Sequence, residues 1–144
     1  MIKIICVGKI KEKFYKEAIT EYLKRLQKYH KIIIEEVPDS DIEHEKDLIL
    51  NKIKEKDYIV TLEIEGTSMD SQEFSNYIDK TFLKTSTITF IIGGSNGLSE
   101  QIKNRANDKI SFSKLTFPHQ LFRVILLEQI YRSFKIIHHE TYHK

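Results

Sequence analysis

The chain has 144 residues, which is enough for one domain and too short for two of ordinary size. Hydrophobic residues make up 40% and charged residues 31%, a globular mixture that excludes an intrinsically disordered chain. The formal net charge of +2 does not demand a nucleic-acid partner, although basic residues crowd positions 9–31 and carboxylates crowd positions 35–47.

The single cysteine, Cys6, excludes an intramolecular disulfide, and its apolar neighbours predict a buried, inert thiol. No apolar run approaches the ~20 residues that a membrane-spanning helix needs. The N-terminus shows neither the apolar region nor the cleavage site of a signal peptide. We therefore expect a soluble, cytoplasmic protein without a membrane partner.

Apolar runs and amphipathic stretches alternate through the first half of the chain. Apolar residues at three- and four-residue spacing between Tyr15 and Tyr29 indicate a helix. The expected order is a strand over 2–7, that helix over 11–29, a strand over 32–37, a helix over about 41–55, and a strand over 58–64 that Gly66 ends.

The second half opens with a helix start at Asp70, where a capping side chain is followed three residues later by Glu73. Pro118 suits the first turn of the last helix, because its missing N–H would have no intrahelical partner there. After the helix that starts at Asp70, the expected order is a strand over 87–92, a helix over 98–106, a strand over 109–112, and a helix to about residue 137. This alternation favours one α/β domain over residues 1–144 with a mostly parallel sheet.

Ligands of such sheets bind beyond the carboxyl ends of the strands, where we expect Gly66 and two loops. The first loop, residues 93–97, contains three glycines but no Walker lysine and no GxGxxG spacing. It indicates either a ligand close to the backbone or a tight turn. The second loop, residues 111–119, mixes hydroxyls with apolar side chains, which suits a flat heteroaromatic ring or a structural cap on the last helix. His119 in this loop is expected to make a structural hydrogen bond, with a catalytic base as the alternative.

The last predicted helix carries four consecutive apolar residues, Val124 to Leu127. A helix that is apolar on most sides is buried in a core or against another chain. Glu128 and Arg132 are four residues apart and are expected to pair.

The polar tail after this helix contains three histidines. His139 and His143 are four residues apart, but no third ligand of the usual spacing accompanies them, so we expect no metal. Two interpretations of the tail remain: a disordered polar end, or an acid–base site that uses Tyr142 and His143.

Several motifs together carry a family resemblance. They are Val7-Gly-Lys9, Leu62-Glu-Ile-Glu-Gly66, Ile92-Gly-Gly-Ser-Asn-Gly97, Ser111-Phe-Ser-Lys-Leu-Thr-Phe-Pro-His119, Glu128-Gln-x-Tyr-Arg132 and Tyr142-His143-Lys144. Along essentially its whole length the chain resembles the bacterial 23S rRNA pseudouridine N3-methyltransferases of the SPOUT class. The resemblance implies an α/β knot with a C-terminal trefoil, S-adenosyl-L-methionine as cofactor, and a homodimer. It also implies that the substrate is a pseudouridine in a stem-loop of 23S rRNA, methylated in the assembled ribosome.

The resemblance also assigns site residues. The implied cofactor contacts are Leu62, Gly93, Phe112, Ser113, Lys114, Leu115, Thr116 and Phe117. The tail would lie near the target base, and our hypothesis is that His143 accepts the N3 proton while Tyr142 orients the base or replaces His143. Lys144 and Arg123 would stabilise negative charge or hold phosphate.

Two departures from the family pattern stand out. His139 occupies a position where relatives often have Gly, a residue that readily adopts a positive φ. The backbone conformation of the tail at His139 is therefore an open question. The 38–47 connection is short. Two alternative functions remain. One is a cofactor-binding module without catalysis, and the other is a structural rRNA-binding protein that uses the basic 9–31 region.

Overall fold

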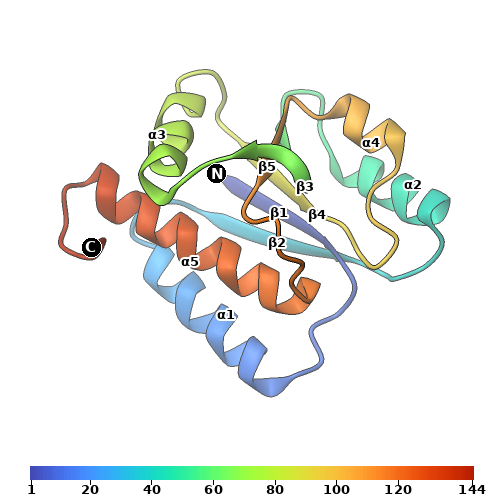
Figure 1. Ribbon diagram of the computed structural model, residues 1–144, viewed down its shortest axis with the longest axis horizontal. Helices are drawn as coiled ribbons and strands as arrows, with labels where there is room; N and C mark the ends of the chain where they lie inside the picture. The colour runs from blue at the N-terminus through green and yellow to red at the C-terminus, as the bar shows by residue number, and fades with distance from the viewer.

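The computed structural model describes residues 1–144 and shows a five-stranded sheet with helices on both faces (Figure 1). The strands follow the order β2-β1-β4-β3-β5, and every neighbouring pair is parallel. The elements are β1 (Ile2–Val7), α1 (Lys13–Leu26), β2 (Ile32–Val37), α2 (Ile42–Lys52), β3 (Tyr58–Ser68), α3 (Ser71–Thr81), β4 (Ile88–Ile92), α4 (Glu100–Arg105), β5 (Asp108–Ser111) and α5 (His119–Ile137). None of the helices combines the length and apolar character needed to cross a membrane. The predicted α/β class with a parallel sheet is confirmed, and the C-terminal trefoil knot stays a prediction.

The sheet separates two hydrophobic layers. Helices α1, α3 and α5 cover one face and α2 and α4 the other (Figure 1). Successive strand side chains point to opposite faces, so Ile4 and Cys6 join the larger cluster while Ile5 and Val7 join the smaller one. Because both faces are covered, the six residues of β1 are all buried. Burial also raises the pKa of the Cys6 thiol to about 12, which agrees with the predicted inert cysteine.

Local sequence signals explain where several helices begin. Asp70 accepts a hydrogen bond from the Glu73 backbone N–H at 2.8 Å, and the Glu73 carboxylate accepts one from the Asp70 N–H at 3.0 Å. This capping box satisfies two N–H groups that the helix itself cannot pair. Asp41 and Ser99 cap α2 and α4 with a single bond each, in which the side chain accepts from a backbone N–H three residues later. The predicted start at Asp70 is thus confirmed.

Gly66 does not end the third strand, and that prediction is wrong. β3 continues to Ser68, with a shift of register against β5 between Leu62 and Thr67. A Cβ on Gly66 would lie 2.7 Å from backbone atoms of Ile110, so only glycine permits the two strands to approach this closely. Leu62 and Thr67 both pair with Ile110, so residues 63–66 bulge out of the strand pair, and residues 62–65 line the candidate site.

Candidate functional site

A pocket with a volume of about 430 Å³ opens at the carboxyl ends of β3, β4 and β5. Three segments that are distant in sequence form most of its wall: residues 62–65, 92–98 and 112–119. The lining residues are Leu62, Glu63, Ile64, Glu65, Ile92, Gly93, Gly94, Ser95, Gly97, Leu98, Lys103, Phe112, Ser113, Leu115, Thr116, Phe117, Pro118, His119 and Phe122. The two loops expected at strand ends therefore meet at one site, as parallel strands require.

The predicted cofactor residues fall almost entirely in this wall. Leu62, Gly93 and all but one of the predicted residues from Phe112 to Phe117 line the pocket; the exception is Lys114, whose side chain is exposed. Ring centroids of Phe112 and Phe122 lie 5.2 Å apart, and those of Phe117 and Phe122 lie 6.3 Å apart. The wall thus offers aromatic surface beside backbone groups, the combination expected for a flat heteroaromatic ring.

Two carboxylates in the pocket wall were missed by the sequence reasoning. Glu63 is held in place because its carboxylate accepts a hydrogen bond from the Thr61 hydroxyl at 2.6 Å and lies 3.4 Å from the Lys103 ammonium. Glu65 lines the same wall. The signal was the sequence Leu62-Glu-Ile-Glu at the end of a buried strand, because it places two carboxylates where ligands of parallel sheets bind.

The glycine loop is both a tight turn and a place of close approach. Gly97 has a φ of 72°, a conformation that side chains other than glycine rarely adopt. A Cβ on Gly94 would lie 2.8 Å from Cγ1 of Val7, and one on Gly93 would lie 3.0 Å from the Gly97 backbone. The loop is therefore compressed against the end of β1, and its backbone stands in the pocket wall.

His119 also lines the pocket, and its ring forms no hydrogen bond within the protein. The predicted structural hydrogen bond of His119 is therefore not present. Its Nε2 lies 3.5 Å from the place a Cβ on Gly8 would take, and Gly8 has a φ of 97°. The histidine at the start of α5 thus packs against the turn that follows β1.

Arg123 does not line the pocket and is buried. Its Nη1 lies 2.6 Å from Oε2 of Glu36, and its Nη2 donates to the Gly8 carbonyl at 3.2 Å. The same Glu36 oxygen accepts from the Ile10 backbone N–H at 3.2 Å. Arg123 therefore fixes the β1–α1 connection to α5 through protein partners, and its role toward negative charge or phosphate stays a prediction.

The tail folds back onto α5 through a carboxylate. Glu128 accepts from Nε of Arg132 at 3.2 Å, which confirms the predicted pair, and from the Tyr142 hydroxyl at 3.1 Å. Burial and the Glu128 charge raise the pKa of Tyr142, so the phenol is neutral near pH 7. Nη1 of Arg132 lies 3.1 Å from Nδ1 of His143, and because arginine can only donate, Nδ1 is the acceptor and the ring carries its proton on Nε2.

The backbone at His139 has a positive φ of 58°, so the chain keeps at this histidine the conformation that glycine adopts most readily. The Glu140 N–H donates to the Lys135 carbonyl at 2.9 Å and the His139 N–H to the Ile136 carbonyl at 3.0 Å. These two bonds form the helix-ending turn in which glycine is usual at the position of His139.

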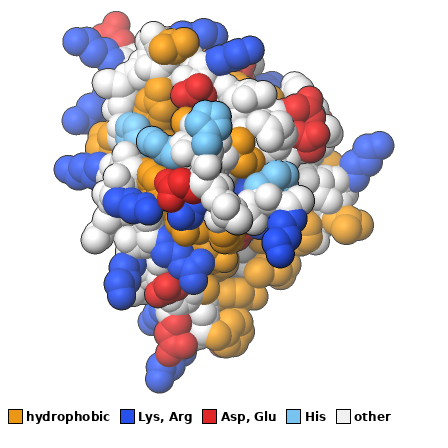
Figure 2. All heavy atoms as spheres, turned by 90° about the vertical axis from the view of Figure 1, so that its left-hand side faces the viewer, with side chains coloured by type: hydrophobic (Ala, Val, Ile, Leu, Met, Phe, Trp, Pro, Cys, Tyr) orange, Lys and Arg blue, Asp and Glu red, His pale blue; other side chains and the backbone are white.

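Figure 2, which looks onto the end of the molecule where the chain terminates, shows histidine side chains grouped near the centre of that face with lysines and arginines around them.

A family model described as predicted SPOUT methyltransferase matches residues 1–143. The chain belongs to the SPOUT methyltransferase family. The Ribosomal RNA large subunit methyltransferase H of Clostridium botulinum (strain 657 / Type Ba4) is 54% identical over an alignment 157 positions long, which covers 99% of each chain. The protein of that name from Caldicellulosiruptor saccharolyticus is 50% identical over 154 residues, covering both chains fully.

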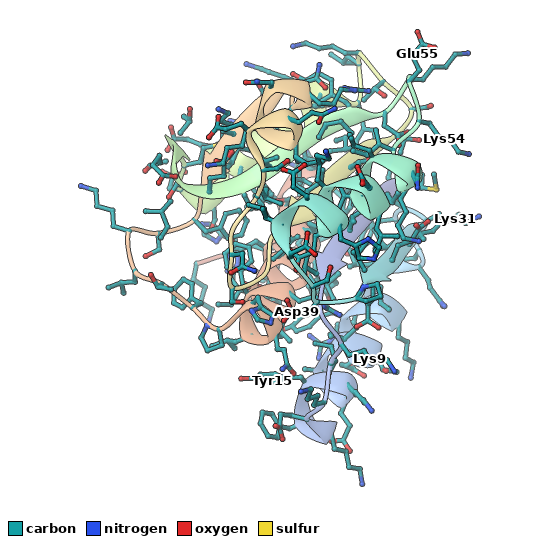
Figure 3. The ribbon with its side chains drawn as sticks, turned by 90° about the vertical axis from the view of Figure 1, so that its right-hand side faces the viewer. Lys9, Tyr15, Lys31, Asp39, Lys54 and Glu55 are labelled. Carbon is teal, nitrogen blue, oxygen red and sulfur yellow. The ribbon has the colours of Figure 1, made fainter.

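These alignments are longer than the chain, so the relatives carry residues that this SPOUT methyltransferase lacks. The short 38–47 connection stays the predicted place of the difference. In the structure Ser40 donates its N–H to Glu45 at 2.7 Å, so the connection turns directly into α2. Figure 3 shows Asp39 on one side of α2, with Lys54 and Glu55 beyond the opposite end of that helix.

The tail of this SPOUT methyltransferase does not reach the pocket of its own chain. Tyr142, His143 and Lys144 are absent from the lining. Tyr142 contacts Glu128, which lies six residues after the pocket residue Phe122, or ~9 Å along a helix axis. The structure therefore brings the predicted cofactor residues together in one place and the predicted tail residues together in another.

Proposed function

We propose that this SPOUT methyltransferase uses S-adenosyl-L-methionine to methylate N3 of a pseudouridine in a stem-loop of 23S rRNA, in the assembled ribosome and in the cytoplasm. The observation that carries the proposal is the convergence of residues 62–65, 92–98 and 112–119 on one pocket of about 430 Å³. That volume lies within the range of ~300–1,000 Å³ that small-molecule and cofactor sites occupy. The relatives that are at least half identical are named as methyltransferases of large-subunit rRNA, which supports the choice of RNA.

The residues of the pocket fit the cofactor. Apolar side chains such as Leu62 and Phe112 suit an adenine ring, the backbone of the 93–97 loop offers hydrogen-bonding groups at its edge, and Glu63 suits the ribose hydroxyls or the ammonium group. S-adenosyl-L-methionine supplies a methyl group on a positively charged sulfur, so the transfer leaves a neutral thioether and needs no metal to activate it.

The chain's own task is to present N3 and to take its proton. We assign the proton to His143, whose neutral ring has one nitrogen able to accept. That nitrogen is engaged by Arg132 in the observed tail, so the RNA has to draw the arginine away, as a phosphate would. Tyr142 is kept neutral by its surroundings and acts as an orienting donor, and the exposed Lys144 is placed for the RNA backbone.

A homodimer is part of the proposal, and its face lies along α1 and α5. Phe14 of α1 is 61% exposed, and Leu121, Val124 and Ile125 of α5 are only half-buried. The Lys11 N–H donates to the Gln120 side chain at 3.1 Å, so the starts of the two helices adjoin and form one surface. A second copy is the expected occupant, because apolar side chains this exposed on adjoining helices favour a protein contact. Val124→Glu is expected to convert the dimer to a monomer in sedimentation experiments, whereas Leu83→Glu is not.

Methyl transfer tests the activity. Labelled S-adenosyl-L-methionine is incubated with ribosomes that lack the modification, with free large subunits and with the isolated stem-loop. His143→Ala and the matched tail variant His138→Ala are run alongside, and cofactor binding is measured by calorimetry. We expect label on ribosomes with the wild type and His138→Ala, and its loss with His143→Ala at unchanged cofactor affinity. Cofactor binding with no label on any RNA would contradict the proposal, and equal labelling of the isolated stem-loop would contradict the need for the ribosome.

A further inference from the structure

The pocket has two chemically different ends, which lie on opposite faces of the sheet. Leu62, Phe112 and Phe122 pack against the larger hydrophobic cluster, on the face that α1, α3 and α5 cover (Figure 1). Leu98 belongs to the smaller cluster, on the face of α2 and α4, and Lys103 of α4 also lines the pocket. The pocket therefore crosses the carboxyl edge of the sheet, from an aromatic end to an end that α4 closes.

The end beside α4 carries a fixed pair of opposite charges. Oε1 of Glu63 lies 3.4 Å from Nζ of Lys103, and Oε2 of Glu63 accepts from the hydroxyl of the buried Thr61 at 2.6 Å. The side chain of Glu63 is 9% exposed and that of Lys103 is 26% exposed. Ile102, the neighbour of Lys103, is fully buried and anchors α4. Both charges thus belong to the pocket wall and not to the open surface.

The ammonium group of Lys103 has capacity for a further acceptor. It carries three N–H donors, and its two carboxylate neighbours, Glu63 and the exposed Glu100, lie at 3.4 and 3.9 Å. A charge-assisted N–H···O bond is shorter, at ~2.7–2.9 Å. The pocket lining contains one lysine and no arginine. Lys103 is therefore the group in this wall that best suits a negatively charged part of a ligand.

We propose that this pair binds the amino-acid part of S-adenosyl-L-methionine, with Lys103 donating to its carboxylate and Glu63 accepting from its ammonium group. The inference rests on the proposed function and adds which end of the pocket holds which end of the cofactor. In an α-amino acid the ammonium nitrogen and a carboxylate oxygen are ~3 Å apart by covalent geometry. The charged atoms of Glu63 and Lys103 are separated by a similar 3.4 Å, so each charge of the ligand meets its opposite.

The adenosine part then occupies the aromatic end of the pocket, beside Phe112 and Phe122. A phosphate of the RNA suits the pair less well. Phosphate carries only negative charge, and the Glu63 carboxylate beside Lys103 would repel it. A zwitterion has a charge for each of the two side chains, which is why the amino-acid part is the preferred occupant.

Two ligands separate the two ends of the pocket. S-adenosyl-L-homocysteine contains the whole product, whereas methylthioadenosine keeps the nucleoside and the thioether and lacks the amino-acid part. Both are titrated by calorimetry into the wild type, Lys103→Met and Glu63→Gln. Lys103→Met removes the charge and keeps the length of the side chain. Lys109→Met, at an exposed position of β5 outside the lining, is the matched control.

We expect Lys103→Met and Glu63→Gln each to weaken binding of S-adenosyl-L-homocysteine by about tenfold or more, the usual effect of losing a charge-assisted hydrogen bond. Affinity for methylthioadenosine should stay within about twofold of wild type, which also shows that the variants are folded. Lys109→Met should match the wild type with both ligands.

Three results would overturn the proposal. If Lys103→Met weakens both ligands equally, Lys103 only shapes the pocket. If Glu63→Gln weakens both equally, Glu63 holds the ribose, which both ligands contain. If Lys103→Met binds S-adenosyl-L-homocysteine as the wild type does but methylates ribosomes less, Lys103 contacts the RNA. A wild type that binds neither ligand overturns the proposed function itself, and the wild-type titration alone identifies that result.

Discussion

The hydroxyl of Tyr142 donates a 3.1 Å hydrogen bond to Glu128, so the last residues of the chain are fixed against the middle of α5. The same carboxylate accepts from Arg132 and from Gln129. Glu128, which is partly buried, therefore holds the tail, α5 and the Gln129 amide in one arrangement.

Glu128→Gln is expected to release the tail, because an amide nitrogen donates where the Tyr142 hydroxyl and Arg132 need an acceptor. Methyl transfer to ribosomes should fall by about tenfold, in line with the loss of charge-assisted hydrogen bonds, while cofactor affinity stays unchanged. Single-turnover rates and calorimetry measure the two. Glu21→Gln breaks an exposed pair with Arg25 of the same spacing and serves as the control. Full activity in Glu128→Gln would show that the tail works without this anchor.

His139→Gly is expected to stabilise the protein by about 0.5–1 kcal/mol, because glycine adopts the positive φ of 58° without strain. His138→Gly, at the neighbouring position with φ of −89°, should destabilise the protein, because glycine there relieves no strain and raises the conformational entropy of the unfolded chain. Urea denaturation followed by circular dichroism compares the two. A stabilisation of the same size in both variants would argue against the backbone as the cause.

The tail should loosen in acid through Glu140. Hydrogen bonds from Tyr29 at 2.8 Å and Lys135 at 3.0 Å lower the pKa of Glu140 to about 2. A carboxyl with a lowered pKa stabilises the fold above its unfolded value of 4.5 and loses that effect as the pH falls towards 2. The protection factors of the amides of residues 139–144, which correct for the pH dependence of intrinsic exchange, should therefore fall between these values in the wild type. In Glu140→Gln the protection factors should be low throughout, and an unchanged acid response in that variant would exclude Glu140 as the cause.

The buried pair of Lys3 and Asp57 should matter for stability and not for catalysis. Both side chains are 5% exposed, and their charged atoms are 2.8 Å apart. Lys3→Ala leaves the acid without its partner and is expected to cost about 3–5 kcal/mol of unfolding free energy. Lys13→Ala breaks an exposed pair and should cost less than about 1 kcal/mol. Equal costs in urea denaturation would mean that burial does not strengthen the Lys3 pair.

Local signals in the sequence were sufficient for most of the framework. The alternation of apolar runs gave the parallel sheet, and the Asp70 capping box gave the start of α3, because both depend on neighbours within a few residues. Gly66 shows the limit of such signals. A glycine late in a strand is equally consistent with an end and with an irregularity, and only the approach of Ile110 from β5 distinguishes them.

The site was predictable to the extent that it depends on strand ends. The loops after β4 and β5 had to meet at one edge, and they do. Arg123 was expected to stabilise negative charge or hold phosphate, and its pairing with Glu36, 87 residues earlier in the chain, is one that spacing does not reveal. The tail's position was equally hidden, because it depends on a left-handed turn at a histidine and on Glu128.

The most direct test of the account is to locate the methyl group on the RNA. Ribosomes lacking the modification are treated with the protein and S-adenosyl-L-methionine, the 23S rRNA is digested, and the fragments are mapped by tandem mass spectrometry. The account predicts one added methyl group, on N3 of a pseudouridine in a stem-loop. A methyl group on a ribose, on another base or on no fragment of the 23S rRNA would contradict it.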